Sequence, residues 1–479
     1  MTYRQFRTIQ TRRSFFEQCG AGLGSIALGH LLAGEGLTAE PSTRTDPMAP
    51  RASHYTGKAR NVIFLFMEGG PSQFDLYDPK PGLRKWHGQA LPESMTKDLR
   101  LAFIKPTAKV MASPRVFTPR GQSGIELSDY LPHLGTVADD ICLVRSMHTD
   151  AFNHHPGQLL LMSGSTQFGR PSMGSWVTYG LGSESSSLPG FVVLSSGKGT
   201  SGGASNYTSG FLPSTYQGVT FRSSGDPVLY LSSPPGISGE TQRASLDLLR
   251  DMNHEHLART GDVEIASRIA SYELAFRMQS AAPELLDFSG ESPETLAMYG
   301  VDKEPTRPYA INCLLARRMV ERGVRFVQLM DASWDDHTEL DKKLKEHCDK
   351  TDQPVAALIR DLKQRGLLES TLVIWGGEFG RTPMVEIRKP GVEGNEGRDH
   401  HPLAYSMWLA GGGIKGGQVV GRTDDIGFNI AEDPIHIHDL HATIMHCLGF
   451  EHTRLTYRHQ GRDFRLTDVA GNVVKKLLA

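Results

Sequence analysis

Uninterrupted apolar runs recur along the chain and mark its predicted strands. The first covers residues 61–67 (Asn-Val-Ile-Phe-Leu-Phe-Met) and ends in Glu68, Gly69 and Gly70. Runs without polar alternation are typical of strands that are covered on both faces. Further runs of this kind occupy residues 141–144, 191–194, 324–329 and 372–375. We therefore expect a sheet of buried, mainly parallel strands.

Helical periodicity fills the stretches between several of these runs. Within residues 240–280, apolar side chains recur by threes and fours, as at Leu246 and Leu249 or at Ile265 and Ile269. This is the spacing of one helix face, and residues 311–321 and 355–366 are predicted as further helices. The alternation predicts an α/β protein with a central, mostly parallel mixed sheet flanked by helices on both faces.

One long stretch, residues 197–239, has neither period. It is rich in Gly, Ser and Pro and is punctuated by Tyr207, Phe211, Tyr216 and Phe221. Irregular inserts of this length in a folded domain are often lids or substrate-facing walls. We expect a loop-rich insert that faces a substrate.

The N-terminal segment has the order of regions found in an export signal. Arg12 and Arg13 precede a Gly/Ala/Leu run at residues 20–33, and residues 37–39 offer a small-residue cleavage site. The run is too short and too rich in glycine for a permanent membrane anchor. Residues 1–39 are predicted to be a twin-arginine signal, read by the twin-arginine export machinery, which delivers folded proteins to the periplasm or the outside. An ordinary basic N-terminus of a cytoplasmic protein is the alternative.

Residues 40–58 are polar, contain prolines and lack any period, so they are predicted to be a disordered linker before a domain at 59–479. Apolar residues make up 39% of the chain and charged residues 22%, and the net charge is -2. This balance favours a soluble globular protein and excludes a basic nucleic-acid-binding surface. The five cysteines show no CxxC spacing, which favours buried free thiols, with two disulfides in the mature chain as the alternative.

Histidines and acids gather just after the predicted strand ends, where open α/β sheets place their ligand sites. A mixture of imidazoles and carboxylates favours zinc, manganese or iron over magnesium and calcium. Their joint occurrence predicts a site for one or two divalent metal ions, zinc or manganese first and calcium or magnesium as the alternatives. The candidate ligands are Asp75, His154, Asp335, His337, Glu378, His400 and His401.

These motifs, in their order along the chain, resemble a known family. The segments are NVIFLFMEGGPSQFDLYDPKP, HHPGQLLLMSG, WDDH, GGEFGRTP, GRDHHP and AGGGIKGGQVVGRTDD, between residues 61 and 468. Together they look like DUF1501, a family of conserved unknown function in the alkaline phosphatase and sulfatase superfamily. The resemblance implies an alkaline-phosphatase-like fold and metal-assisted hydrolysis of phosphate or sulfate esters.

The resemblance also implies roles for single residues. An acid after the first strand binds metal in the superfamily, and Asp75 matches it best. The nucleophile position, about ten residues before Ser163-Gly164, is held by His154 instead of Ser, Thr or Cys. His154 is therefore expected to be a metal ligand with water as nucleophile, and a phosphohistidine is the alternative.

The remaining matches are partial. Asp335 and His337 compress the superfamily's Asp-x-x-x-His pair, and Glu378 keeps a carboxylate where Phe379 replaces an imidazole. The last histidine is His400 or His401. These matches imply one metal strongly and a second metal only weakly.

Two arginines flank the glycine-rich loops of these motifs. Arg381 and Arg398 are expected to hold a tetrahedral anion, with ordinary surface charge as the alternative. The segment from Cys313 to Arg317 does not match the modified-cysteine motif of classical sulfatases, so a formylglycine mechanism is not expected.

Two further patterns imitate functional motifs. Residues 411–416 satisfy GxGxxG, but the following Gln418-Val419-Val420 reads as a strand and not as the helix of a dinucleotide site. The histidines at 436, 438, 441 and 446 have the spacing of a packed helix.

The sequence thus predicts an exported metal-dependent hydrolase of phosphate or sulfate esters, acting on a small-molecule or glycan ester. The alternative is a catalytically inactive envelope protein that binds glycans on the same fold. The missing nucleophile and Phe379 are the features that favour this second hypothesis.

Overall fold

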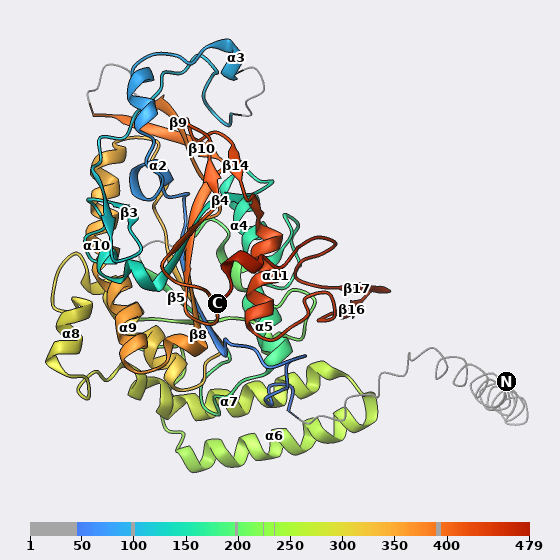
Figure 1. The fold of residues 1–479 in the computed structure, drawn as a ribbon. Coiled ribbons are helices and arrows are strands. Elements are labelled where there is room, and N and C mark those ends of the chain that lie inside the picture. The colour runs from blue at the N-terminus through green and yellow to red at the C-terminus, as the bar shows by residue number, and fades with distance from the viewer. Residues whose placement is uncertain (1–45, 97–100, 197–199, 224, 234, 389–393) are drawn as a thin grey trace, which may run out of the picture. The chain divides into compact units, whose positions relative to one another are not determined.

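The apolar runs form the central sheet of the larger unit of the chain, Pro47–Ala479, in the computed structural model (Figure 1). The structure describes residues 46–96, 101–196, 200–223, 225–233, 235–388 and 394–479. The predicted signal at 1–39 and the first part of the predicted linker lie outside the described residues.

The main sheet has nine strands in the order β12-β4-β11-β8-β1-β7-β5-β6, with β15 paired to β4. Only β11, which pairs antiparallel with β4 and β8, runs against the others among the described strands. The predicted mixed, mostly parallel sheet is therefore confirmed. The strands are β1 (Asn61–Met67), β4 (Ile141–His148), β5 (Phe191–Ser196), β6 (Val219–Phe221), β7 (Phe326–Asp331), β8 (Thr371–Gly376), β11 (Tyr405–Ala410), β12 (Gln418–Val420) and β15 (Ile435–His436).

Strand β1 explains why its sequence lacks polar alternation. It lies between β7 and β8, and all seven of its residues are buried. Ile63 and Leu65 pack on the side of α7 to α10, whereas Phe64 and Phe66 pack on the side of α4, α5 and α11. Figure 1 shows these helix groups on opposite sides of the sheet. Both faces of the strand are thus removed from water, which requires apolar residues at every position.

The larger helices are mostly longer than the periodic stretches of the sequence. They are α4 (His154–Ser163), α5 (Met173–Leu181), α6 (Gly239–Thr260), α7 (Val263–Leu286), α8 (Pro293–Tyr299), α9 (Arg307–Glu321), α10 (Leu340–Gln364) and α11 (Ile437–Cys447). The predicted helix at 240–280 is two helices. Gly261 ends α6 at φ +68, and the Asp262 side chain accepts the N–H of Glu264 to begin α7.

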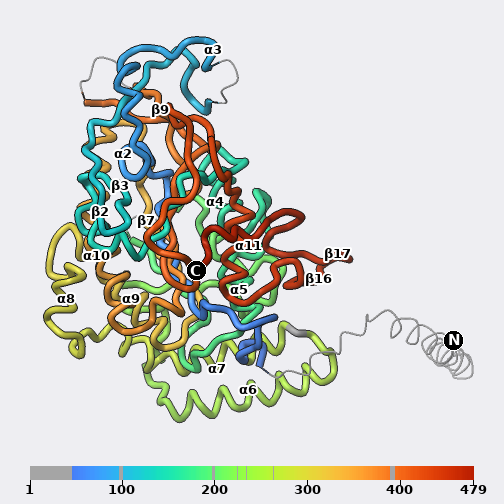
Figure 2. The backbone as a smooth tube through the Cα atoms, in the orientation of Figure 1, coloured from blue at the N-terminus to red at the C-terminus, as the bar shows by residue number. Residues whose placement is uncertain are grey.

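Short elements outside the main sheet complete the fold. Strands β9 and β10 pair antiparallel, and Figure 2 shows blue α2 beside orange β9 although they are far apart in sequence. The Gln73 side chain of α2 exchanges hydrogen bonds with the main chain of Arg381 in β9, at 2.8 and 2.9 Å. The elements are α2 (Gln73–Leu76), α3 (Glu93–Thr96), β2 (Phe117–Arg120), β3 (Ile125–Ser128), β9 (Gly380–Ile387), β10 (Glu396–His401), β13 (Arg422–Thr423), β14 (Ile430–Glu432), β16 (Tyr457–His459) and β17 (Arg462–Phe464).

Two expectations differ from the structure. Residues 46–58 do not behave as a disordered linker, because the N–H of Arg51 bonds to the carbonyl of Leu181 at the end of α5, and that of Tyr55 to Gly449. The aromatics of the insert 197–239 do not face a substrate either. Tyr216 and Phe221 are buried in the two main cores, and β6 adds an edge strand beside β5.

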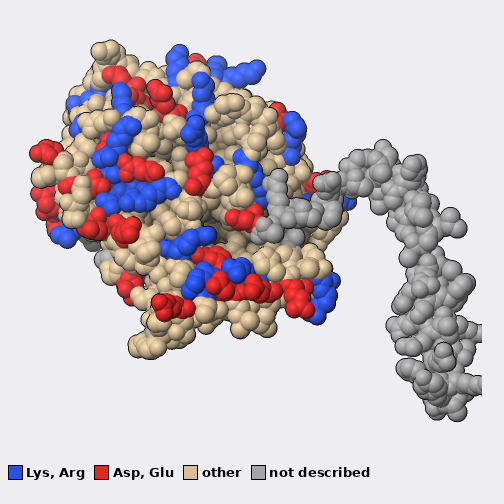
Figure 3. Space-filling view, turned by 90° about the horizontal axis from the view of Figure 1, so that it is seen from below, with Lys and Arg blue, Asp and Glu red and all other residues tan. Residues whose placement is uncertain are grey.

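Three properties of the described part agree with its composition. Cys142, Cys313, Cys348 and Cys447 are buried free thiols, as predicted. Figure 3 shows both signs of charge interspersed over the face seen from below, where no continuous basic patch appears. None of the described helices combines the length and apolar character that crossing a membrane requires.

Candidate metal centre

The topology of the sheet brings predicted site residues to one edge. Strands β4, β7 and β8 run in the same direction, so their carboxyl ends meet. His154 begins α4 after β4, whereas Asp335 and His337 lie in the loop after β7. His400 lies in β10, opposite Arg381 of β9, in the segment that follows β8.

Four of the predicted residues converge there, with one ligand atom each within 4.8 Å of the others. The Oδ1 atom of Asp335 lies 3.3 Å from Nε2 of His154, 2.8 Å from Nε2 of His337 and 3.1 Å from Nε2 of His400. Ligand atoms bound to one zinc ion at about 2.1 Å lie within about 4.2 Å of one another. The three distances from Asp335 lie below this limit, as does the 3.0 Å between Nε2 of His337 and Nε2 of His400, which fits a single ion. We call the four residues His154, Asp335, His337 and His400 the metal cluster, meaning the candidate ligands of one ion.

The other ring nitrogen of each histidine is held by an acceptor. Nδ1 of His154 lies 2.7 Å from Oε1 of Glu378, and Nδ1 of His400 lies 2.8 Å from the carbonyl oxygen of Phe152. Nδ1 of His337 bonds to Oε2 of Glu386. An acceptor at Nδ1 places the proton there and leaves the lone pair of Nε2 for a metal, which is the usual support of metal-binding histidines. All three rings are thus oriented toward Asp335.

Burial and close charges set the protonation of the metal cluster. Burial opposes ionisation of Asp335, but the close contacts with the three imidazoles and the charge of Arg381 hold its pKa well below the usual range. Burial likewise lowers the pKa of His154, yet Asp335 and Glu378 outweigh it and raise the pKa to about 9. Burial, with the charges of Arg381 and His154, lowers the pKa of His400 to about 4. Burial is likewise outweighed at His337, where Asp335 and Glu386 raise the pKa. Without metal, these contacts therefore favour the protonated forms of His154 and His337.

Two glycines allow the loops to approach the metal cluster. A Cβ atom at Gly69, whose φ is +121, would lie 2.3 Å from the backbone nitrogen of Asp335, and one at Gly397 would lie 2.0 Å from the carbonyl carbon of His337. The N–H of Gly69 also donates to both oxygens of Glu378, at 3.1 and 3.2 Å. These glycines permit a packing that any side chain would obstruct.

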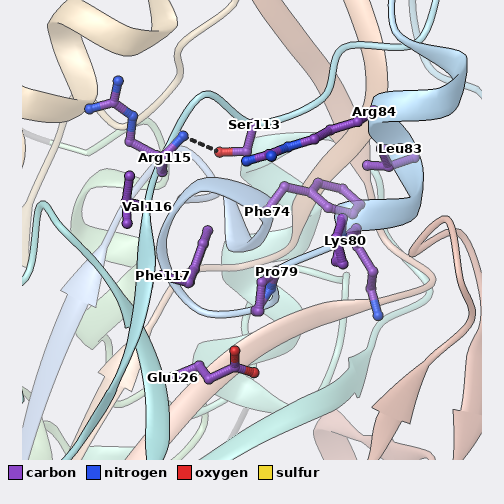
Figure 4. A pocket seen from close by; sticks show the side chains of 11 residues that line it. Phe74, Pro79, Lys80, Leu83, Arg84, Ser113, Arg115, Val116, Phe117 and Glu126 are labelled. Atoms are coloured by element: carbon purple, nitrogen blue, oxygen red, sulfur yellow. Dashed lines mark hydrogen bonds between the residues drawn. The ribbon is translucent and has the colours of Figure 1, made fainter.

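Asp75 and Arg398 do not belong to the metal cluster but form a buried pair. Nε of Arg398 lies 2.9 Å from Oδ2 of Asp75, and Oγ of Ser72 donates to the same oxygen at 2.5 Å. Burial alone would raise the pKa of Asp75, but Arg398 lowers it. A cavity of about 350 Å³ is lined by Phe74 and Ser113 and by no residue of the metal cluster. Figure 4 shows side chains that line it, and the guanidinium of Arg398 lies 5.2 Å from the ring centre of Phe74.

Three other predicted residues have internal roles. The guanidinium of Arg381 is buried, donates to the carbonyls of Gly70 and Arg398, and lies 2.6 Å from Oδ1 of Asp335. It is thus neither surface charge nor a free anion clamp. The Glu378 carboxylate is hydrogen-bonded to Nδ1 of His154. Nε2 of His401 is instead hydrogen-bonded to the carbonyl oxygen of Phe428 at 2.7 Å.

A second group of possible ligand atoms, from His337, Glu386 and Asp399, is already occupied. Oδ2 of Asp399 accepts the N–H groups of Ala102, Phe103 and Ile104, and Oδ1 accepts that of His400. Glu386 is shared between His337 and Arg388. This group therefore supports the metal cluster and does not suggest a second ion. The sequence placed Asp399 beside His400 but held no signal for Glu386 or for the carbonyl of Phe152.

Comparisons with solved structures find remote likenesses. A protein in the alkaline phosphatase superfamily from Vibrio parahaemolyticus is 10% identical, with a TM-score of 0.34, and the match covers 86% of this chain and 73% of that one. PsFucS1 sulfatase from Pseudoalteromonas sp. is 10% identical, with a TM-score of 0.35 and coverages of 82% and 68%. A TAB5 alkaline phosphatase mutant with Mg bound in the M3 site is 12% identical, with a TM-score of 0.33 and coverages of 83% and 99%. Likenesses this remote transfer no function.

Sequence comparison is more specific. No curated protein matches the chain. The family described as "Protein of unknown function (DUF1501)" matches residues 59–478, which include every residue of the metal cluster. The chain therefore belongs to the DUF1501 family.

Proposed function

We propose that this protein is a metal-dependent hydrolase of phosphate or sulfate esters, with one divalent ion held by His154, Asp335, His337 and His400. The observation that carries the proposal is the convergence of three Nε2 atoms on the Asp335 carboxylate while all three Nδ1 atoms are engaged elsewhere. Three imidazoles and one carboxylate favour zinc or manganese over magnesium or calcium. A bound ion supplies Lewis-acid activation of water and of the ester.

Charge at the site favours an anionic substrate. One ionised carboxylate among neutral imidazoles leaves a divalent ion with a net positive charge. The N-terminus of α4 also lies at His154, and the Asn153 side chain makes no capping hydrogen bond there. Helix N-termini attract anions because their first N–H groups lack partners within the helix. A phosphate or sulfate ester meets both preferences.

The residues of the site support water as the nucleophile. The superfamily resemblance places a nucleophile at His154, where this chain has no hydroxyl or thiol. Nδ1 of His154 is hydrogen-bonded to Glu378, and Nε2 lies 3.3 Å from Oδ1 of Asp335 without a hydrogen bond. A phosphohistidine would require one of these contacts to break. Glu378 instead keeps the ring oriented through the reaction.

The test combines metal analysis with activity. The mature chain should contain about one zinc or manganese ion, measured by mass spectrometry, and hydrolyse aryl phosphates or aryl sulfates until a chelator is added. His337→Ala should lose the metal, whereas the exposed control His133→Ala should keep it. Absence of bound metal together with absence of chelator-sensitive turnover would overturn the proposal.

One observation favours a second candidate, a glycan-binding envelope protein without catalysis. Arg381 and Arg398, expected to hold the anion, are both buried and bonded within the protein. Binding on a glycan array that survives combined replacement of His154 and His337 by alanine would favour this candidate over the enzyme.

We also propose export by the twin-arginine route to the periplasm or the outside. The order of Arg12-Arg13 and the weak apolar run supports it. Cell fractionation should find wild-type protein outside the cytoplasm and the Arg12→Lys, Arg13→Lys variant inside it. Equal export of both would contradict this route.

A further inference from the structure

Three exposed phenylalanines lie in segments that contact the metal cluster or a residue next to it. Phe103 is 57% exposed, Phe152 48% and Phe168 67%, and these are the exposed phenylalanines of the described part of the chain. Single exposed apolar residues are ordinary, but apolar residues gathered at one place mark an interaction surface. The three come from segments far apart in sequence, and we call them the aromatic rim.

Each residue of the aromatic rim contacts a histidine of the cluster or its neighbour. The ring centroid of Phe103 lies 5.3 Å from that of His400 and 5.8 Å from that of His337. The carbonyl oxygen of Phe152 holds Nδ1 of His400 at 2.8 Å. The ring of Phe168 lies 5.0 Å from that of His155, the residue after His154. The ring of Phe103 therefore packs directly against two proposed ligands, whereas Phe152 and Phe168 adjoin the cluster through a backbone carbonyl and through His155.

The backbone of Phe103 is held in a defined position. Its own N–H and those of Ala102 and Ile104 donate to Oδ2 of Asp399, at 2.8, 3.1 and 3.1 Å. The other oxygen of Asp399 accepts the N–H of His400 at 2.8 Å. One buried carboxylate thus fixes the backbone of Phe103 to the backbone of a proposed metal ligand. An exposed ring on a backbone held in this way is prepared for contact with a ligand, because little backbone freedom remains to be lost on binding.

We propose that the aromatic rim binds the alcohol part of the ester and selects alcohols with a flat apolar ring, such as aryl groups. The inference rests on the proposed function, because it assumes that the anionic group of the ester lies at the metal cluster. The phenylalanine side chain has no hydrogen-bonding group, so the rim binds apolar ring surface through stacking and edge contacts. It offers nothing specific to a charged or polyhydroxylated alcohol.

Binding of non-hydrolysable anions to the zinc-loaded full chain tests the proposal. Phenylphosphonate and benzenesulfonate carry the ring, and methylphosphonate and methanesulfonate lack it. Isothermal titration calorimetry should show at least one phenyl compound binding about tenfold or more tightly than its methyl counterpart. Phe103→Ala should remove most of this preference without lowering the zinc content, and Phe103→Trp should retain it. The exposed aromatic control Tyr230→Ala should match the wild type.

The outcomes separate this inference from the proposed function. Equal affinity for phenyl and methyl compounds would overturn the proposed role of the aromatic rim, and so would failure of both phenyl compounds to bind. In either case, metal-dependent ester turnover would still decide the hydrolase proposal. A phenyl preference that depends on Phe103 in a protein without any ester turnover would support the rim and contradict the hydrolase.

Discussion

Two acids follow strands of the same sheet, and their surroundings differ in kind. Asp75 is paired with the guanidinium of Arg398, a permanent cation, and accepts a further hydrogen bond from Ser72. Asp335 faces three imidazoles, whose charge can be given up, besides the guanidinium of Arg381 at 2.6 Å from the same oxygen, and its side chain is 40% exposed. An acid whose only cation is an arginine has no proton to exchange, whereas a carboxylate that also contacts oriented imidazoles can exchange their protons for a metal ion. The comparison distinguishes a structural acid from a ligand.

The largest expected effect lies at the ligand. Asp335→Ala removes the oxygen on which three Nε2 atoms converge, so metal affinity should fall by more than the roughly 10- to 100-fold typical of supporting residues. Asp335→Ala also leaves the buried guanidinium of Arg381 without its carboxylate partner, so the free energy of unfolding of the metal-free protein should fall as well. Metal titration and urea unfolding measure the two quantities. Full metal affinity in this variant would remove Asp335 from the site.

At the structural acid, we expect a loss of stability without a loss of metal binding. Asp75→Ala leaves Arg398 as an unpaired buried cation, which should lower the free energy of unfolding by about 3–5 kcal/mol. The fraction that remains folded should still bind one metal ion, because the Asp75 side chain bonds to Arg398 and Ser72, which lie outside the metal cluster. Loss of metal without loss of stability would show that the two acids have been assigned the wrong way round.

A smaller loss of metal affinity is expected at the carboxylates that orient the histidine ligands. Glu378→Gln weakens the acceptor that orients Nδ1 of His154, so metal affinity should fall about 10- to 100-fold. Glu386→Gln should act in the same way through His337. Glu432→Gln serves as a matched control, since the exposed carboxylate of Glu432 forms a surface ion pair with Arg422. Unchanged affinity in both supporting variants would contradict the orienting role.

The smallest effect is on pH dependence. In the metal-free protein His154 has a pKa of about 9, so at pH 7 to 8 it carries a proton that a metal must displace. Metal affinity should therefore rise at least roughly tenfold per pH unit up to about pH 9 and level off above it. His400, with a pKa of about 4, adds a further loss only in acid. Calorimetry in buffers of different ionisation enthalpy should detect at least about one released proton, and none would contradict the assignment.

The sequence predicted the sheet well because burial on two faces forces apolar residues at every position of a strand. Residues 61–67 were predicted as a strand, and β1 has the same bounds. The helix α10 was harder, since its first half is rich in charged residues, and only its apolar second half has a readable period. Residues 46–58 were missed because their partners lie hundreds of residues away.

The candidate site was predictable in outline but not in detail. Histidines and acids after strand ends indicated a metal cluster, and the structure brings four of them together. The sequence left His400 and His401 as equals, because successive residues of a strand point to opposite sides and nothing local shows which side holds the site. Asp75 looked like a ligand because its partner Arg398 is 323 residues away in the chain.

The four proposed ligands span residues 154 to 400, on segments that meet only through strands β4, β7 and β8 and the β9–β10 hairpin. Such a centre cannot be assembled on a partial chain, so an ion can be captured only after most of the polypeptide has reached its final topology. If the protein leaves the cytoplasm already folded, the choice of ion is made where the chain is synthesised, and the metal pool of that compartment decides what the secreted protein carries.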